Sequence, residues 1–457
     1  MKKNIIYTAG FCATLLFSQC AKKLDELKPY QSFTSQIALG TPDNVKNAVT
    51  GVYGIVRGAT MYGGDMVMSA DLLGGNSDLN WRGTFFAPRD VYSKGMVADN
   101  GIALGMWDEA YNAINSANSV LENINVITNT ADRNLAKGEV QFLRALCYFD
   151  LARYFGQPWD VAGANTGLAV PLMLKANDFS KVSRATLTQV YAQVLADLTE
   201  AESILPTTNG NRANKYTAKA LLARVYLQQG NYAQALAKAQ EVIASNKYSL
   251  NVGVTTLFDG DNTPEAIFEI QQNSVNNAGQ SNGGIATFYA NMNGIGRGDV
   301  EIRNEHLALY ETGDTRKADL FYVGTGGKPG ETACGKWKSP TKNYNIIRLA
   351  EMILIRAEAN FRLASSTGAT VLDDINQIRN RAGLANLATA TLAAILKERQ
   401  LELCFEGHRI HDIKRLKQNV VAILPAATYP FDSPKLVMPI PLREMDVNPN
   451  LVQNVGY

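Results

Sequence analysis

The fold is decided by a stretch in the middle of the chain, Ala218-Lys219-Ala220-Leu221-Leu222-Ala223-Arg224-Val225-Tyr226-Leu227, which is followed by Gly230 and then by Asn231-Tyr232-Ala233-Gln234-Ala235. Apolar residues in the first part recur at i, i+3, i+4 and i+7, which predicts a helix with one buried face. Gly230 predicts the end of that helix, and a second helix begins after it. Because Ala223 is small and Tyr226 is large, the second helix can approach closely while the groove between the two is filled.

This pattern is typical of a tetratricopeptide-like helix pair. Ala145 with Tyr148, and Ala357 with Asn360, occupy similar places in two other stretches. Thr41-Pro42-Asp43 predicts a helix start, with Thr41 as the N-cap and a proline in the first turn. Helical units are expected over about 41–57, 102–128, 131–155, 186–246 and 345–418, the last two divided into 186–204, 213–229 and 231–246, and into 345–364, 371–382 and 391–418. The chain is therefore expected to be all-α.

Two long insertions, about 58–100 and 250–343, interrupt the helical units. Both are rich in glycine and contain aromatic residues, and neither shows sustained periodicity. Long irregular segments in a compact protein are usually functional. We expect a degenerate solenoid of helix pairs whose insertions are functional.

The first residues are typical of an export signal. Lys2 and Lys3 precede an apolar run that ends at Phe17, and Ser18-Gln19-Cys20 follows. We predict a signal peptide over 1–19, lipidation of Cys20 and a lipid-anchored tether over 20–40. Because Gln19 stands where lipoprotein signals carry a small residue, an ordinary secretory peptide is the alternative.

Charge excludes an obvious electrostatic partner. The chain has 44 Lys+Arg and 42 Asp+Glu, and cleavage before Cys20 would remove Lys2 and Lys3 and leave 42 of each sign. Such a balance leaves no excess of positive charge that would indicate binding to nucleic acid or to an anionic membrane surface. Only 3 histidines are present. His408 and His411 lie one helical turn apart but have no third ligand at a recognisable spacing, so neither a metal nor a cofactor is expected.

Several motifs in order resemble the SusD/RagB family of outer-membrane nutrient-binding lipoproteins of Bacteroidetes. They include Gly138-Glu139-Val140-Gln141-Phe142-Leu143-Arg144-Ala145, Tyr344-Asn345-Ile346-Ile347-Arg348-Leu349-Ala350-Glu351 through Ala359, Arg381-Ala382-Gly383-Leu384, Phe405-Glu406-Gly407-His408-Arg409 and Pro439-Ile440-Pro441. The likeness extends from Cys20 to Tyr457, with a SusD-like domain over 41–457.

The resemblance implies a right-handed bundle of four tetratricopeptide-like pairs that carries an irregular binding subdomain. It also implies a SusC-like TonB-dependent transporter as partner, on which the lipoprotein sits facing the cell surface, and a role in capturing oligosaccharides for import. Some members take peptides instead. A tetratricopeptide-like scaffold that binds only proteins, and a glycoside hydrolase, are further alternatives.

A sugar site needs aromatic faces for the rings and polar side chains for the hydroxyls. The first insertion offers these groups on a glycine-flanked loop, and family members present ligand contacts in this place. We therefore predict ligand binding by Asp78, Asn80, Trp81 and Arg82 from this loop, and by Tyr289, Arg297, Tyr322 and Trp337 from the second insertion. The alternative is that the aromatic residues only pack the loops.

Carboxylates at helical spacing raise the possibility of glycosidase chemistry. These are Glu351, Glu358, Glu398, Glu402 and Glu406, and arginines are interspersed among them. Arginine neighbours lower a carboxylate pKa, which suits an ion-pair scaffold and not a general acid. We therefore predict a binding protein with no catalytic residues.

Overall fold

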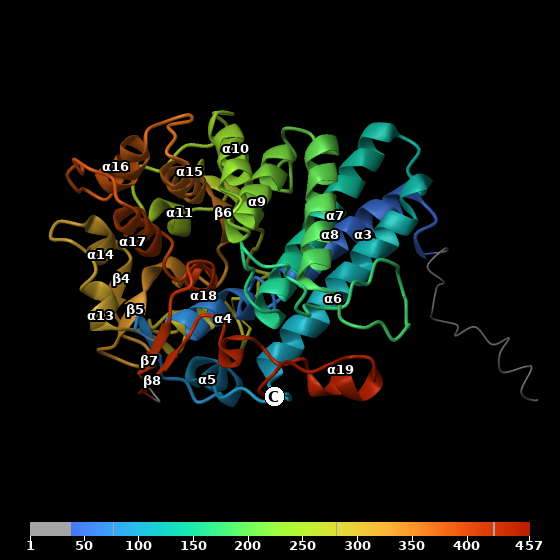
Figure 1. The fold of residues 1–457 in the computed structure, drawn as a ribbon, viewed down its shortest axis with the longest axis horizontal. Coiled ribbons are helices and arrows are strands. Elements are labelled where there is room, and N and C mark those ends of the chain that lie inside the picture. Colours follow the sequence, from blue (N-terminus) through green and yellow to red (C-terminus); the bar gives the residue numbers. More distant parts are fainter. Residues whose placement is uncertain (1–37, 76, 280, 424–425) are drawn as a thin grey trace, which may run out of the picture.

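The computed structural model describes residues 38–75, 77–279, 281–423 and 426–457. The predicted signal peptide, Cys20 and most of the tether lie outside these residues. Four helix pairs follow one another in the described chain, each packed on the next. They are α3 (Pro42–Val56) with α6 (Gly101–Glu122), α7 (Thr130–Phe155) with α8 (Leu187–Ile204), α9 (Lys215–Gln228) with α10 (Tyr232–Ile243), and α15 (Leu349–Leu363) with α16 (Val371–Arg381). The predicted all-α class is confirmed, and Figure 1 shows the pairs side by side.

Local capping explains where several of these helices begin. The Thr41 side chain accepts a hydrogen bond from the Asn44 backbone N–H, with Pro42 in the first turn. Thr186 and Gln189 form a reciprocal capping box at the start of α8. These starts are encoded within a few residues, which is why the sequence pattern could place them.

The first insertion contains regular structure that was not expected. It holds α4 (Asp65–Gly74), β1 (Leu79–Trp81) and α5 (Phe86–Ser93). Every residue of α4 is buried, so the helix has no polar face and no amphipathic period to detect. Within the described residues, no helix is long and apolar enough to cross a membrane.

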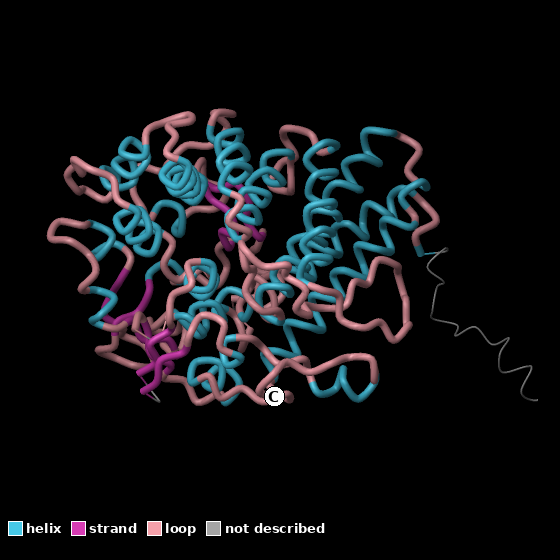
Figure 2. The backbone as a smooth tube through the Cα atoms, viewed as in Figure 1, coloured by secondary structure: helices cyan, strands magenta, loops and turns pink. Residues whose placement is uncertain are grey.

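The second insertion carries short elements. It contains α11 (Thr256–Asp259), β2 (Ala266–Ile270), α12 (Ile285–Tyr289), β3 (Val300–Ile302), α13 (Asn304–Leu307), α14 (Thr315–Asp319), β4 (Phe321–Val323) and β5 (Thr332–Cys334). Of these elements, α12 packs against α4 and β3 pairs with β1. The strands form two-stranded antiparallel ribbons: β1 with β3, β2 with β6 (Tyr344–Arg348), β4 with β5, and β7 (Val420–Ile423) with β8 (Ala426–Tyr429). Figure 2 shows most of these ribbons gathered at the end of the molecule away from the first helix pairs.

Two predicted helical ranges are wrong in part: 345–364 at its start and 391–418 in its middle. Residues 345–348 belong to β6, because this segment pairs with β2, and the helix begins at Leu349. The range 391–418 is divided into α17 (Leu392–Glu402) and α18 (Arg409–Arg415). Between them, Phe405 and Gly407 have positive φ, which no helix tolerates.

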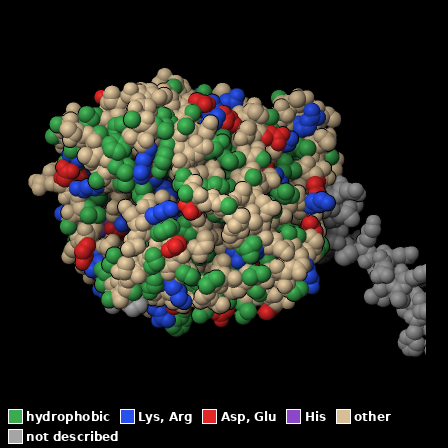
Figure 3. All heavy atoms as spheres, viewed as in Figure 1, with side chains coloured by type: hydrophobic (Ala, Val, Ile, Leu, Met, Phe, Trp, Pro, Cys, Tyr) green, Lys and Arg blue, Asp and Glu red, His purple; other side chains and the backbone are tan. Residues whose placement is uncertain are grey.

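The predicted ion-pair scaffold is confirmed. All five glutamates accept a salt bridge from arginine: Glu351 from Arg224, Glu358 from Arg415, Glu398 from Arg316 and Arg379, Glu402 from Arg348 and Arg381, and Glu406 from Arg348. At the molecular surface, by contrast, acidic and basic side chains are interspersed on the face seen in Figure 3.

Candidate functional site

The two insertions meet at the ribbon formed by β1 and β3. Trp81 is paired with Val300 and Asn80 with Glu301, and the backbone N–H of Arg82 donates to the Asp299 carbonyl at 2.7 Å. The Asn80 amide also donates to the Glu301 carboxylate at 2.8 Å. The structure therefore brings the predicted residues Asn80, Trp81 and Arg82 against the second insertion, although more than 200 positions separate Asn80 from Glu301 in the chain.

Beyond the end of this ribbon lies a surface formed by Arg82, Phe85, Phe86 and Arg297, which we call the loop surface. Phe85 is 39% exposed and Phe86 is 68% exposed. The Arg297 guanidinium lies 4.8 Å from the centroid of the Phe85 ring, and its Nε donates to Asp299 Oδ2 at 2.8 Å. Arg82 is half-exposed between the carboxylates of Glu301 and Glu331, at 3.0 and 3.2 Å.

The loop surface combines the two properties that sugar binding requires. Exposed phenyl faces can stack on the apolar side of a pyranose ring, and guanidinium and carboxylate groups can bond its hydroxyls. Phe85 and Phe86 were not among the predicted contacts. Their position shortly after Trp81-Arg82-Gly83 on the same loop could have indicated a ligand contact. Phenylalanine has no polar group, however, so the sequence does not distinguish these two residues from core residues.

Trp81 was expected to be an exposed stacking platform, and that expectation is wrong. Its side chain is 8% exposed, and its ring lies 5.6 Å from that of Phe288. Arg297 covers the Phe288 ring at 5.0 Å from its centroid. Trp81 therefore packs beneath the loop surface. Arg297 contacts both Phe85 and the Phe288 ring that packs on Trp81.

Tyr289 and Trp337 are also buried, so the expectation that they are exposed is wrong. The Tyr289 hydroxyl donates to Asp71 Oδ2 at 2.8 Å, and the Trp337 indole N–H donates to the Phe405 carbonyl at 2.8 Å. Both rings fill the space around α4 and α17. Tyr322 is half-buried in β4, and its hydroxyl accepts from the Asn291 backbone N–H at 2.9 Å.

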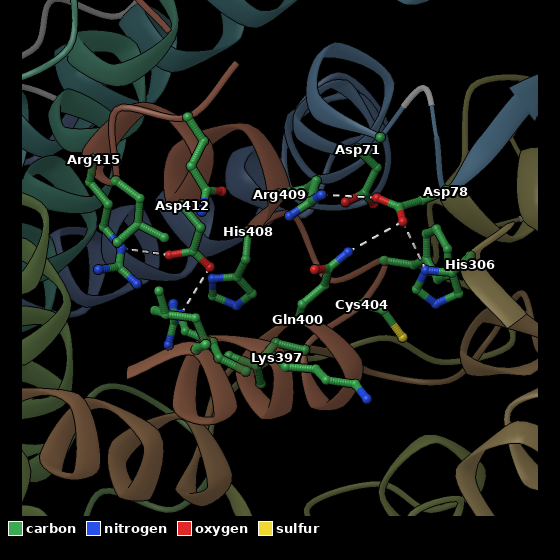
Figure 4. Close-up of a pocket in the computed structure, with 18 of the residues that line it drawn as sticks. Asp71, Asp78, His306, Lys397, Gln400, Cys404, His408, Arg409, Asp412 and Arg415 are labelled. Carbon is green, nitrogen blue, oxygen red and sulfur yellow. Dashed lines mark hydrogen bonds and ion pairs between the residues drawn. The ribbon is translucent and has the colours of Figure 1, made fainter. Parts of the chain in front are cut away.

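Asp78 lies at the other end of β1 and faces a cavity. Its Oδ1 is 3.0 Å from His306 Nδ1, and its Oδ2 accepts from Arg409 Nε at 2.9 Å. The Gln400 amide approaches Oδ1 at 3.3 Å. Figure 4 shows these side chains converging from the α4–β1 loop, α13, α17 and α18. Asp78 is thus separated from Asn80, Trp81 and Arg82, which lie toward the loop surface.

The cavity has a volume of about 580 Å³, which is within the range of small-molecule sites. α17 supplies one wall with Leu392, Leu396 and Lys397, and α18 supplies another with Arg409 and Asp412. The break between these helices, where Phe405 and Gly407 have positive φ, is what leaves the space open. Sequence reasoning did not find this cavity, because its walls come from four separate parts of the chain.

Burial and charge set the protonation of the groups that line the cavity. Burial raises the pKa of Asp71 to about 8, so this carboxyl is protonated at neutral pH. Burial alone would raise the pKa of Asp78, but the hydrogen bond from His306 and the charge of Arg409 lower it below its usual value. Burial would lower the pKa of His306, but its interactions with Asp78 and Cys404 together outweigh burial and the pKa rises to about 9. Asp78 and His306 therefore form an ion pair.

Comparison with known proteins gives consistent matches along the chain. A family model described as "SusD family" matches residues 333–457, and one described as "Starch-binding associating with outer membrane" matches residues 30–227. The SusD-like protein P2 of Formosa agariphila is 27% identical over 100% of both chains. The starch-binding protein SusD of Bacteroides thetaiotaomicron is 25% identical over 70% of this chain and 72% of its own.

Solved structures agree with the sequence matches. A crystal structure of a SusD superfamily protein from Bacteroides thetaiotaomicron has a TM-score of 0.82 and 26% identity, and it covers 91% of this chain and 99% of its own. The motifs from Tyr344 to Arg409 lie within the residues that the SusD family model matches. The chain belongs to the SusD/RagB family.

Proposed function

We propose that this protein captures oligosaccharides on its loop surface as the binding component of an outer-membrane import system. The observation that carries the proposal is the exposed Phe85 ring beside the Arg297 guanidinium, with exposed Phe86 next to it in the chain and half-exposed Arg82 on the same loop. Support also comes from the named relatives, one of which is a starch-binding protein. Binding would be reversible, since stacking and hydrogen bonding form no covalent bond.

The outer membrane is the proposed location. Support comes from the family model that describes starch-binding proteins associated with this membrane. Lipidation of Cys20 would anchor the chain, and a SusC-like TonB-dependent transporter would receive the ligand. Radiolabelled palmitate incorporation into the chain but not into Cys20→Ser tests the anchor. Recovery of a TonB-dependent transporter with the affinity-tagged protein tests the partner.

Binding without catalysis is the proposed chemistry. The glutamates that could act as the acid and base of a glycosidase form salt bridges with arginines inside the core. The arginine charges overcome burial and lower the pKa of Glu402 far below its usual value, so this group cannot act as an acid at neutral pH. Release of reducing ends from polysaccharide by the purified protein would contradict this part of the proposal.

Calorimetric titration of the purified full chain against oligosaccharide and peptide panels tests the capture role. We expect saturable binding to one class of oligosaccharide. Binding of peptides alone would replace the ligand class. Failure to bind either panel, together with recovery of a protein partner, would favour a scaffold role and contradict glycan capture.

A further inference from the structure

The cavity beside Asp78 has an arginine whose hydrogen-bonding capacity is only partly used. Arg409 is the first residue of α18, and its Nε donates to Asp78. Its side chain is 26% exposed. Among the described residues, no acceptor lies within hydrogen-bonding distance of its Nη1 or Nη2. These two nitrogens present the end-on face of a guanidinium, which matches the two oxygens of a carboxylate.

Asp78 is a single carboxylate that two basic side chains share. Arg409 lies 2.9 Å from its Oδ2 and His306 lies 3.0 Å from its Oδ1. His306 is buried at 1% exposure, whereas the Arg409 side chain is 26% exposed. The positive charge of the Arg409 guanidinium is therefore only partly compensated on the side that faces the cavity.

The end of the cavity lined by Asp412 differs from the end lined by Asp78, because its arginines are paired with carboxylates. Asp412 lies between Arg399 Nε at 2.9 Å and Arg415 Nε at 2.7 Å. Arg415 also binds Glu358 at 2.7 Å, away from the cavity. Figure 4 shows Asp412 and Arg415 on one side of the cavity and Arg409 with Asp78 on the other. An anion in the cavity would thus be drawn to Arg409.

The remaining lining suits a sugar ring. Leu392, Leu396 and Leu403 provide apolar surface, while Lys397 and Gln400 lie one turn apart on α17. Lys397 is partly exposed at the rim, 3.8 Å from Glu311. Apolar walls with a few placed polar groups are typical of sites that orient a small ligand.

We propose that this cavity is a carboxylate-binding subsite for a sugar acid residue of the captured oligosaccharide, with Arg409 as the bidentate partner. The proposal rests on the proposed capture of oligosaccharides and adds that the preferred ligand is acidic. Lys397 and Gln400 position the ring hydroxyls, and the leucines contact the ring.

The test compares each acidic oligosaccharide with its own carboxyl-reduced form. Oligogalacturonides, oligoglucuronides and oligomannuronides are titrated calorimetrically into the unmodified protein, each beside the neutral sugar of the same linkage and length. For at least one pair we expect the acid to bind about ten- to a hundredfold more tightly, as for hydrogen bonds to charged groups. No preference for the acid in any pair overturns the proposal, and no variant is needed for this result.

Variants then assign the preference to Arg409. Arg409→Gln should abolish it, and Arg409→Lys should retain only part, because lysine cannot bind a carboxylate bidentately. Lys397→Gln, at the exposed rim, should reduce the affinity for the acid and leaves the buried ion pairs intact. The matched control is Arg443→Gln, an exposed arginine with one aspartate partner, Asp108, at 3.4 Å; it should change nothing. A preference that persists in Arg409→Gln overturns the assignment.

Failure of this inference can be distinguished from failure of the proposed function. If neutral and acidic sugars bind equally and Phe86→Ala weakens both, the loop surface is correct and the acidic subsite is wrong. If Phe86→Ala has no effect while Arg409→Gln removes the acid preference, the subsite is correct and the loop surface is wrong.

Discussion

Gly83 lies directly against the indole of Trp81, where an added Cβ would stand 2.4 Å from the indole Cζ2 and 2.9 Å from Cγ of Asp299. The loop can pass over the indole only because residue 83 has no side chain. This contact holds Arg82 and Phe85 above the buried ring and so determines the shape of the loop surface.

Gly83→Ala should therefore destabilise the protein by about 1–3 kcal/mol, the usual cost of overpacking a core. The free energy of unfolding, measured with guanidinium chloride, checks this. Gly51→Ala is the matched control, because nothing lies within 4 Å of its Cβ position in α3. It should stabilise the protein by roughly 0.5–1 kcal/mol. Equal effects of the two substitutions would contradict the described contact.

Phe86→Ala should weaken oligosaccharide binding by about tenfold without changing stability, because an exposed aromatic face contributes on the order of 0.5–1.5 kcal/mol beyond its area. Calorimetry with the best ligand of the panel measures the change. Phe179→Ala is the control, since Phe179 is 91% exposed and lies outside the loop surface. If Phe179→Ala has the larger effect, ligand binds elsewhere.

Glu402→Gln should be destabilising, by about 3–5 kcal/mol, because it removes a buried negative charge that three buried arginines share. The carboxylate lies 2.7 Å from Arg348 and also contacts Arg381 and Arg316. Thermal and denaturant unfolding measure the loss. The control Glu305→Gln removes an exposed partner of Arg303 and should cost less than about 1 kcal/mol. A small effect at Glu402 would show that the network is not needed for stability.

Asp71 should make stability fall as the pH rises. Its pKa is raised from 3.8 to about 8 by burial, so between these pH values the folded state holds a proton that the unfolded state has released. Stability then decreases with pH in this window, and the contribution of the buried acid is lost as pH passes through 8. Asp71→Asn removes this titration while its carbonyl can still accept from Tyr289.

Unfolding curves of the wild type and Asp71→Asn at pH 4.5, 6 and 7.5 check this prediction. The variant should gain stability relative to the wild type as pH rises. Parallel pH profiles for the two proteins would mean that Asp71 is ionised in the folded state or does not titrate in this range.

The sequence by itself determined the helices and the buried charge scaffold. The start at Thr41 and the pair around Ala223 and Gly230 are local patterns, and their consequences appear within a few turns. Family motifs were readable for the same reason. The arginine–glutamate alternation from Arg348 onward indicated charge pairing, although it did not show which residues pair, since Arg224 and Glu351 are 127 positions apart. The middle of 391–418 was misjudged because the break at Phe405 and Gly407 depends on how the chain entering α18 packs against α4.

Only the tertiary structure decided which side chains are accessible. Trp81, Tyr289 and Trp337 stand on loops that look exposed, but contacts with Phe288, Asp71 and the Phe405 carbonyl bury them. The cavity requires Asp78, His306, Gln400 and Arg409 to converge from positions spread over more than 300 residues. Exposure and convergence are properties of packing between distant segments, and no local pattern of residues encodes them.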